Sequence, residues 1–142
     1  MGRDNGQGME MKSRILVVDD ERAAKFLIRQ IFRKEIREDL YELEYAQNGQ
    51  EALGILEKDP EYHLVLADIN MPVMDGLSML AIISEKYPKI KVIMVSAYSD
   101  MAKIRKSMNH GAYDYINKPI DPKDLKETVS RGLALVHRRN QS

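Results

Sequence analysis

An apolar run that ends in a carboxylate constrains the fold of this chain more than any other feature. Residues 64–67 (Leu-Val-Leu-Ala) are uniformly apolar, which is typical of a strand buried on both faces of a sheet. The run ends at Asp68, and Pro72 then indicates a loop. Ligands of parallel α/β sheets bind at the carboxyl ends of the strands. Because an unpaired carboxylate beside a core is costly, we expect a functional role for Asp68 rather than a helix cap, for which Asp75 is better placed.

The rest of the chain alternates between strand and helix patterns. Residues 15–18 and 92–95 are apolar throughout, whereas residues 41–46 and 113–117 alternate polar and apolar side chains, as edge strands do. The segments between them repeat apolar residues with the period of a helix, about 3.6 residues. We therefore predict five strands alternating with five helices. The first helix is expected to bury one apolar stripe, made of Ala24, Leu27, Ile28 and Ile31.

Local signals predict where several helices begin and end. Asp75 is expected to cap a helix, and Gly111 is expected to end another. Asn48-Gly49 is interpreted as a turn before a helix over residues 51–58. The helix after Asp75 is expected to bury the stripe Leu77, Leu80, Ala81 and Ser84.

The pattern of buried and mixed strands suggests their order in the sheet. Placing the two mixed strands at the edges matches the known order 2-1-3-4-5 of flavodoxin-like folds, a three-layer α/β sandwich with one parallel sheet. In that order the first and third strands are neighbours, and their carboxyl ends carry Asp19, Asp20 and Asp68. We expect these three side chains to share one crevice.

Composition narrows the class of protein. The 142 residues suit one domain over residues 13–138, with a disordered tail at 1–12 and a tail or the start of a linker at 139–142. Lys and Arg balance Asp and Glu at 22 each, so we expect no direct nucleic-acid binding. Cysteine is absent, which excludes disulfides and thiol chemistry. With no apolar run near the ~20 residues of a membrane span and no signal-peptide pattern, we expect a cytoplasmic protein without membrane contact.

The acidic crevice indicates a particular chemistry. Three carboxylates repel one another unless a cation joins them, and hard oxygen ligands favour Mg²⁺. The fourth strand ends in the Ser96 hydroxyl and the Ala97 backbone N–H, and the fifth ends in Lys118. A cation, an ammonium and hydrogen-bond donors around one carboxylate stabilise a phosphoryl group in transfer. Asp68 would then be the nucleophile.

Five separated motifs also carry a family resemblance: Asp19-Asp20, Asp68-Ile69-Asn70-Met71-Pro72, Asp75-Gly76, Ser96-Ala97 and Tyr115-Ile116-Asn117-Lys118-Pro119. In this order they resemble the receiver domain of two-component response regulators, the CheY-like family, over roughly residues 13–138. The resemblance implies that the chain is a signalling domain, not an enzyme acting on other substrates, and that it catalyses its own phosphorylation and dephosphorylation. Its implied partners are a histidine kinase or phosphotransfer protein and a downstream effector protein or domain.

The same resemblance assigns a role to each motif residue. Asp68 would accept the phosphoryl group; Mg²⁺ would be held by Asp19, Asp20, Asp68 and the backbone carbonyl of Asn70. Ser96 and Lys118 would contact the phosphoryl group, and Tyr115 would be the aromatic switch that moves with Ser96. Serine replaces the threonine that is commoner at position 96; the hydroxyl is kept.

One subfamily differs from this chain in its predicted output face. Receivers of winged-helix transcription factors form a phosphorylation-dependent symmetric dimer held by charge pairs. The chain keeps the acid Asp114 but has Thr128 and Ser130 where that subfamily carries basic partners. Because interfacial charge pairs set partner choice, we expect no dimer of that type.

Two other protein classes fit the sequence less well. A haloacid dehalogenase-type phosphatase would need an Asp-x-Asp pair, but the first strand ends Asp19-Asp20-Glu21. A flavodoxin would need a phosphate loop there, and these acids would repel its phosphate. A histidine metal site is not expected either, and His63, His110 and His137 are expected to be ordinary surface or strand-edge residues.

Overall fold

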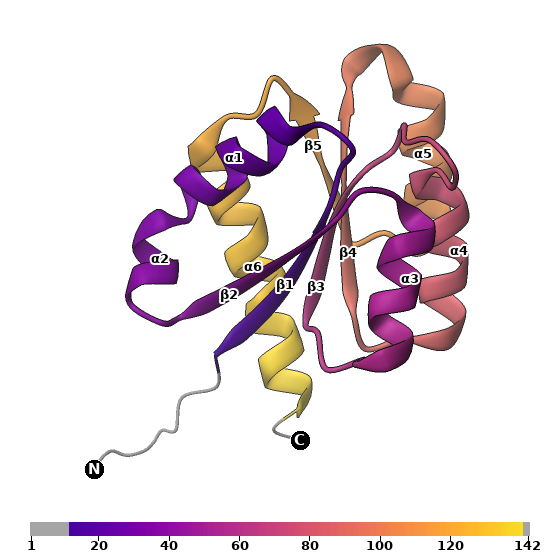
Figure 1. The fold of residues 1–142 in the computed structure, drawn as a ribbon. Coiled ribbons are helices and arrows are strands. Elements are labelled where there is room, and N and C mark those ends of the chain that lie inside the picture. The colour runs from indigo at the N-terminus through magenta and orange to yellow at the C-terminus, as the bar shows by residue number, and fades with distance from the viewer. Residues whose placement is uncertain (1–11, 141–142) are drawn as a thin grey trace.

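A single five-stranded parallel sheet forms the centre of the computed structural model, which describes residues 12–140. Its strands run in the order β2-β1-β3-β4-β5, so the predicted fold class and strand order are confirmed (Figure 1). The strands are β1 (Ser13–Val18), β2 (Tyr41–Ala46), β3 (Leu64–Asp68), β4 (Lys91–Ala97) and β5 (Asp114–Lys118). The tail predicted at residues 1–12 lies, apart from Lys12, outside the described residues.

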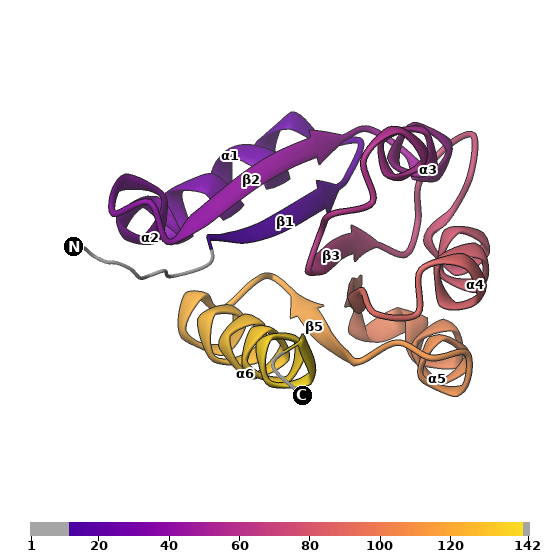
Figure 2. The same ribbon diagram turned by 90° about the horizontal axis from the view of Figure 1, so that it is seen from below.

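Helices cover both faces of the sheet and make the molecule three-layered (Figure 2). One face carries α1 (Arg22–Ile31), α2 (Arg33–Arg37) and α6 (Pro122–Asn140), and the other carries α3 (Gly49–Lys58), α4 (Gly76–Lys86) and α5 (Met101–Asn109). A hydrophobic core lies on each side; Phe32 and Leu125 belong to the first, and Leu56 and Leu80 to the second. Helix α6 continues through residues 139–140, which the sequence assigned to a tail or linker. Within residues 12–140, no helix has both the length and the apolar character of a membrane span.

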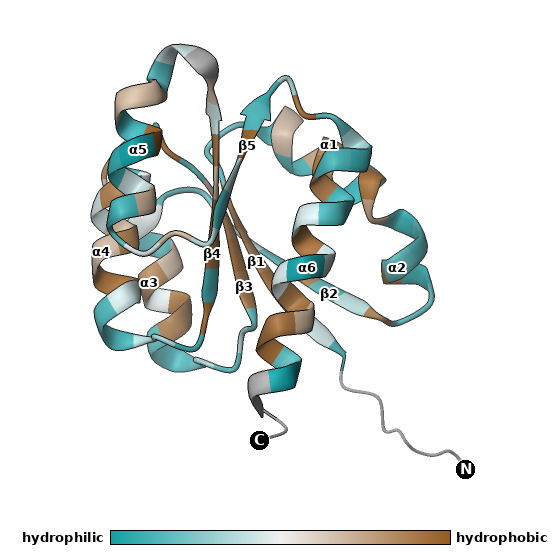
Figure 3. Cartoon of the chain, turned by 180° about the vertical axis from the view of Figure 1, so that it is seen from behind, coloured by the Kyte–Doolittle hydropathy of each residue, from teal (hydrophilic) through white to brown (hydrophobic). Residues whose placement is uncertain are grey.

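The position of each strand in the sheet explains its sequence pattern. All of β3 is buried, and β1 and β4 are buried except near their ends. The edge strands β2 and β5 alternate or are half-buried. Figure 3 shows the difference as brown residues along β1 and β3 and teal residues along β2 and β5. Strands with helices on both faces and neighbours on both sides bury every side chain, whereas edge strands expose part of theirs.

The predicted helix ends are largely confirmed. Asp75 caps α4 by accepting a hydrogen bond from the Ser78 backbone N–H at 2.8 Å. Gly111 follows the end of α5 with a φ of +103°, a conformation that glycine adopts readily. The interpretation of Asn48 as a turn was wrong, because its side chain caps α3 by accepting from the Glu51 N–H at 2.9 Å. Sequence reasoning overlooked that Glu51 lies at the third position after this cap, as in a capping box.

Two predicted apolar stripes were partly wrong. In α1, Ile28 is buried but Leu27 is 41% exposed. In α4 the buried residues are Gly76, Met79, Leu80 and Ile83, so the true stripe lies one position earlier than predicted. The cause is Gly76: an added Cβ there would lie 2.5 Å from the Asp68 carbonyl oxygen. The helix can approach β3 this closely only with glycine facing the sheet, and that contact sets its rotation.

Candidate functional site

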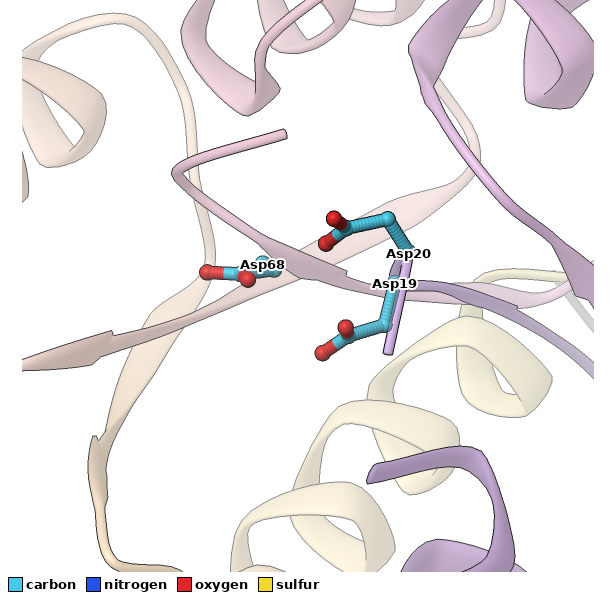
Figure 4. Close-up of side chains that lie close together, drawn as sticks. All are labelled: Asp19, Asp20 and Asp68. Carbon is cyan, nitrogen blue, oxygen red and sulfur yellow. The ribbon is translucent and has the colours of Figure 1, made fainter. Parts of the chain in front are cut away.

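The three predicted carboxylates meet at one edge of the sheet, as expected. Strands β1 and β3 are parallel neighbours with Val18 paired to Ala67, so Asp19, Asp20 and Asp68 follow at the same level. One oxygen from each carboxylate lies within 4.8 Å of the others. Figure 4 shows the three side chains close together, two from the end of β1 and one from the end of β3.

Backbone N–H groups orient two of these carboxylates. Asp68 Oδ1 accepts a hydrogen bond from the Asn70 N–H at 3.2 Å, and Asp19 Oδ1 accepts from the Glu21 N–H at 2.8 Å. The side chains of Asp19 and Asp68 are only 5% and 9% exposed, whereas Asp20 is exposed. The site therefore has a buried pair of acids and one acid at its entrance.

Lys118 reaches this acidic group from β5. Its Nζ lies 3.3 Å from Asp68 Oδ2 and 3.9 Å from Asp19 Oδ2. Because β4 separates β5 from β3, the lysine extends across the end of β4 to make these contacts. Burial alone would lower the pKa of Lys118, but the carboxylates of Asp68 and Asp19 outweigh burial and raise it. The ammonium therefore stays charged beside Asp68.

One ammonium does not balance three acids. Burial raises the pKa of Asp68, and Lys118 and the Asn70 N–H offset that rise only in part. Burial also raises the pKa of Asp19, with a further contribution from the charge of Asp68. A site with excess negative charge and converging carboxylate oxygens suits a hard divalent cation such as Mg²⁺. The donor set thus fits the predicted metal.

The Ser96 hydroxyl makes a contact that the sequence did not predict. Ser96 is 1% exposed, and its Oγ donates a hydrogen bond to Asp100 Oδ2 at 2.8 Å. The same oxygen of Asp100 accepts from Asn70 Nδ2 at 3.0 Å, and Asn70 Oδ1 accepts from Lys103 Nζ at 2.6 Å. Among the described residues, no hydrogen bond joins Ser96 to Asp68. Asp100 occupies the cap position of α5, and no sequence pattern indicated its contact with Ser96.

The remaining predicted residues also lie on the strands around this edge. Ala97 ends β4 and pairs with Lys118 of β5. Tyr115, also in β5, is half-buried and packs against the core on the α3, α4 and α5 side. Asn70 lies in the loop after β3, two residues beyond Asp68. The structure thus gathers Asp19, Asp20, Asp68 and Lys118 into one cluster, with Ser96 turned to Asp100.

Two histidines meet elsewhere in the molecule, which the sequence did not predict. The rings of His63 and His137 lie 4.9 Å apart, beside the start of β3 and near the end of α6. His63 Nδ1 accepts from the Arg14 N–H at 2.9 Å, and burial lowers the pKa of His63. His137 Nε2 lies 2.9 Å from Ser13 Oγ. These contacts lie at the amino ends of β1 and β3, away from the acidic cluster.

Comparisons with known proteins agree with this geometry. The model of the response regulator receiver domain matches residues 15–130. The chain is 34% identical over 126 residues to sporulation initiation phosphotransferase F of Bacillus subtilis and spans 97% of that protein. It is 35% identical over 132 residues to the DNA-binding transcriptional regulator NtrC of Proteus hauseri, of which it spans 26%.

A solved structure shows the same likeness. The response regulator receiver domain protein (CheY-like) of Methanospirillum hungatei superposes with a TM-score of 0.81 at 34% identity, covering 91% of this chain and 99% of that one. Motifs, fold, site geometry and relatives agree: the chain belongs to the response regulator receiver domain family of two-component signalling systems.

Proposed function

We propose that Asp68 accepts a phosphoryl group from the phosphohistidine of a histidine kinase or phosphotransfer protein. The observation that carries this proposal is the surroundings of Asp68: a nearly buried carboxylate with Lys118 Nζ at 3.3 Å and two further acids beside it. A lysine that only neutralised a core acid would leave no reason for Asp19 and Asp20 to converge there.

The transfer requires one bond to form and one to break. A carboxylate oxygen of Asp68 attacks phosphorus, the bond between phosphorus and the histidine nitrogen breaks, and the product is an aspartyl-phosphate. The Lys118 ammonium, already beside Asp68, contacts an oxygen of the incoming group, and the Ala97 N–H and the Ser96 hydroxyl donate to others. Lys118 lowers the barrier as a donor already in place, because it needs no reorganisation when charge develops. The Ser96 hydroxyl first has to leave its hydrogen bond to Asp100.

The acids would hold Mg²⁺ through Asp19, Asp20, Asp68 and the backbone carbonyl of Asn70. Bound there, the ion would neutralise charge on the phosphoryl oxygens during transfer. Asp19 and Asp68 are held in place by the Glu21 and Asn70 N–H groups, so two ligands are positioned before the ion arrives.

The proposed product is a signal rather than a released compound. Movement of Ser96 toward the phosphoryl group, followed by Tyr115 of β5, would change the face formed by α5, β5 and α6. That face would bind a downstream effector protein or domain. Relatives such as the regulator NtrC are much longer than the matched region, which is consistent with a separate effector part in those proteins.

A small phosphodonor tests this function. Acetyl phosphate or phosphoramidate with Mg²⁺ should add one phosphoryl group to the wild-type chain, measured by intact-protein mass spectrometry. Lys118→Ala should slow labelling by about 100-fold, the usual cost of removing one such donor, while Mg²⁺ affinity changes far less. Equal labelling of wild type and Asp68→Asn would contradict the proposal.

A further inference from the structure

A chain of side-chain hydrogen bonds connects the loop after β3 to the start of α5. Ser96 Oγ and Asn70 Nδ2 both donate to Asp100 Oδ2, at 2.8 and 3.0 Å. Lys103, in the first turn of α5, donates to Asn70 Oδ1 at 2.6 Å. One carboxylate oxygen of Asp100 thus holds both Ser96, near the end of β4, and Asn70, in the loop after β3.

The Asp100 side chain has no part in capping its helix. Asp100 occupies the cap position of α5, yet its side chain makes no capping hydrogen bond. An acid at this position commonly accepts from a backbone N–H of the first turn. Here the carboxylate is directed to Ser96 and Asn70 instead, and hydrogen bonds to a charged acceptor are the stronger kind.

The hydroxyl of Ser96 cannot serve two acceptors at once. A serine hydroxyl has a single proton to donate. In this structure the proton goes to Asp100, so a phosphoryl oxygen on Asp68 could receive it only after that bond breaks. The side chain of Ser96 is buried, and water cannot readily replace the lost partner.

We propose that Asp100 is a positioning residue that holds the Ser96 hydroxyl away from the phosphoryl site in the resting state. This inference rests on the proposed phosphorylation of Asp68. Asp100 competes with the phosphoryl group for Ser96, so it weakens the phosphorylated state and keeps the unphosphorylated protein inactive. Release of Ser96 also alters the Asp100 contact with Asn70, and through Lys103 the change reaches α5.

Binding of beryllofluoride, a mimic of the phosphoryl group, measures this competition directly. With saturating Mg²⁺, Asp100→Ala should bind beryllofluoride about tenfold more tightly than wild type, the usual worth of one hydrogen bond to a charged group. Asp100→Asn keeps the size of the side chain but loses its charge, so its affinity should lie between the two. Ser99→Ala, on the same turn with an exposed side chain, is the matched control and should bind like wild type.

A double-mutant cycle separates this effect from simple charge removal. If Asp100 acts through the Ser96 hydroxyl, Asp100→Ala should change beryllofluoride affinity by less than about twofold in a Ser96→Ala background. If removing the negative charge merely favours an anion, the tenfold gain would persist there, and the proposal would be overturned. Without any mimic, amide NMR signals of the β4–α5 loop in Asp100→Ala should move toward those of beryllofluoride-bound wild type.

The outcomes distinguish this inference from the function on which it rests. Wild type that fails to bind beryllofluoride with Mg²⁺ would overturn the proposed function and this inference with it. Normal binding by wild type, together with equal or weaker binding by both Asp100→Ala and Asp100→Asn, would overturn the role of Asp100 alone.

Discussion

At the scale of single residues, burial of Asp68 opposes the negative charge of its carboxylate. The pKa of Asp68 is raised chiefly because the carboxyl group is buried, even with Lys118 beside it. The unfolded chain therefore loses this proton near the ordinary value of 3.8, while the folded chain still holds it. The folded state binds more protons, so this group lowers stability as the pH rises above 3.8.

The neutral isostere Asp68→Asn should consequently stabilise the metal-free protein. We expect its free energy of unfolding at pH 7 to exceed that of wild type by about 1 kcal/mol, the usual size of a single-site effect, and the difference to shrink toward pH 4. Urea unfolding with a chelator present measures both values. Mg²⁺ should then stabilise wild type more than Asp68→Asn, because binding to the folded state adds stability by mass action. A variant less stable than wild type at pH 7 would contradict this expectation.

At the scale of elements, the approach of α4 to β3 depends on Gly76. An added Cβ would meet the Asp68 carbonyl oxygen at 2.5 Å and the Ile69 Cα at 2.9 Å. Both atoms belong to the backbone and cannot move aside without displacing the proposed phosphoacceptor. Gly76→Ala should lower the free energy of unfolding by about 1–3 kcal/mol, the usual cost of overpacking, and slow phosphorylation.

A second helical glycine provides the control. Gly54, inside α3, is exposed, and a Cβ added there would have no neighbouring atom within 4 Å. Gly54→Ala should raise the free energy of unfolding by about 0.5–1 kcal/mol through helix propensity alone, and leave phosphorylation unchanged. Thermal and urea unfolding of both variants give the comparison, and a stable, fully active Gly76→Ala would contradict the close contact between α4 and β3.

The sequence predicts the arrangements that local patterns determine, and it does not predict those that depend on contacts between distant segments. Parallel strands place their carboxyl ends at one edge, so the apolar runs, together with the strand order known for flavodoxin-like folds, predicted that Asp19 and Asp68 would meet. The rotation of α4 could not be inferred from apolar periodicity, because the contact of Gly76 with β3 sets it. The hydrogen bond from Ser96 to Asp100 depends on the conformation of the loop between β4 and α5. The contact between His63 and His137 depends on how α6 packs beside the start of β3.

At the scale of the whole molecule, the face formed by α5, β5 and α6 is the one on which a dimer of the winged-helix type would form. Asp114, the acid that this chain shares with receivers that form winged-helix dimers, accepts from Arg131 of its own α6 at 3.4 Å. Thr128, at one position where that subfamily has a basic partner, is 2% exposed. In the described chain Asp114 is thus paired within its own α6 and Thr128 is buried, so neither is free for the charge pairs that specify such a dimer.

The chain should therefore not form that dimer on activation. Sedimentation velocity of the full chain, with and without beryllofluoride and Mg²⁺, should give the same mass at concentrations up to about 100 μM, far above the Kd of a specific interface. A symmetric dimer that appears only with beryllofluoride and pairs Asp114 across this face would show that the intrachain contact with Arg131 gives way.

The position of the phosphoryl group itself tests the role of Asp68 most directly. After labelling with acetyl phosphate and Mg²⁺, borohydride reduces an acyl phosphate to an alcohol and marks the modified residue for peptide mass spectrometry. We predict the mark on Asp68 alone, and its absence from Asp68→Asn. A mark on Asp19, Asp20 or a residue outside the acidic cluster would contradict the assignment of Asp68 as the phosphoacceptor.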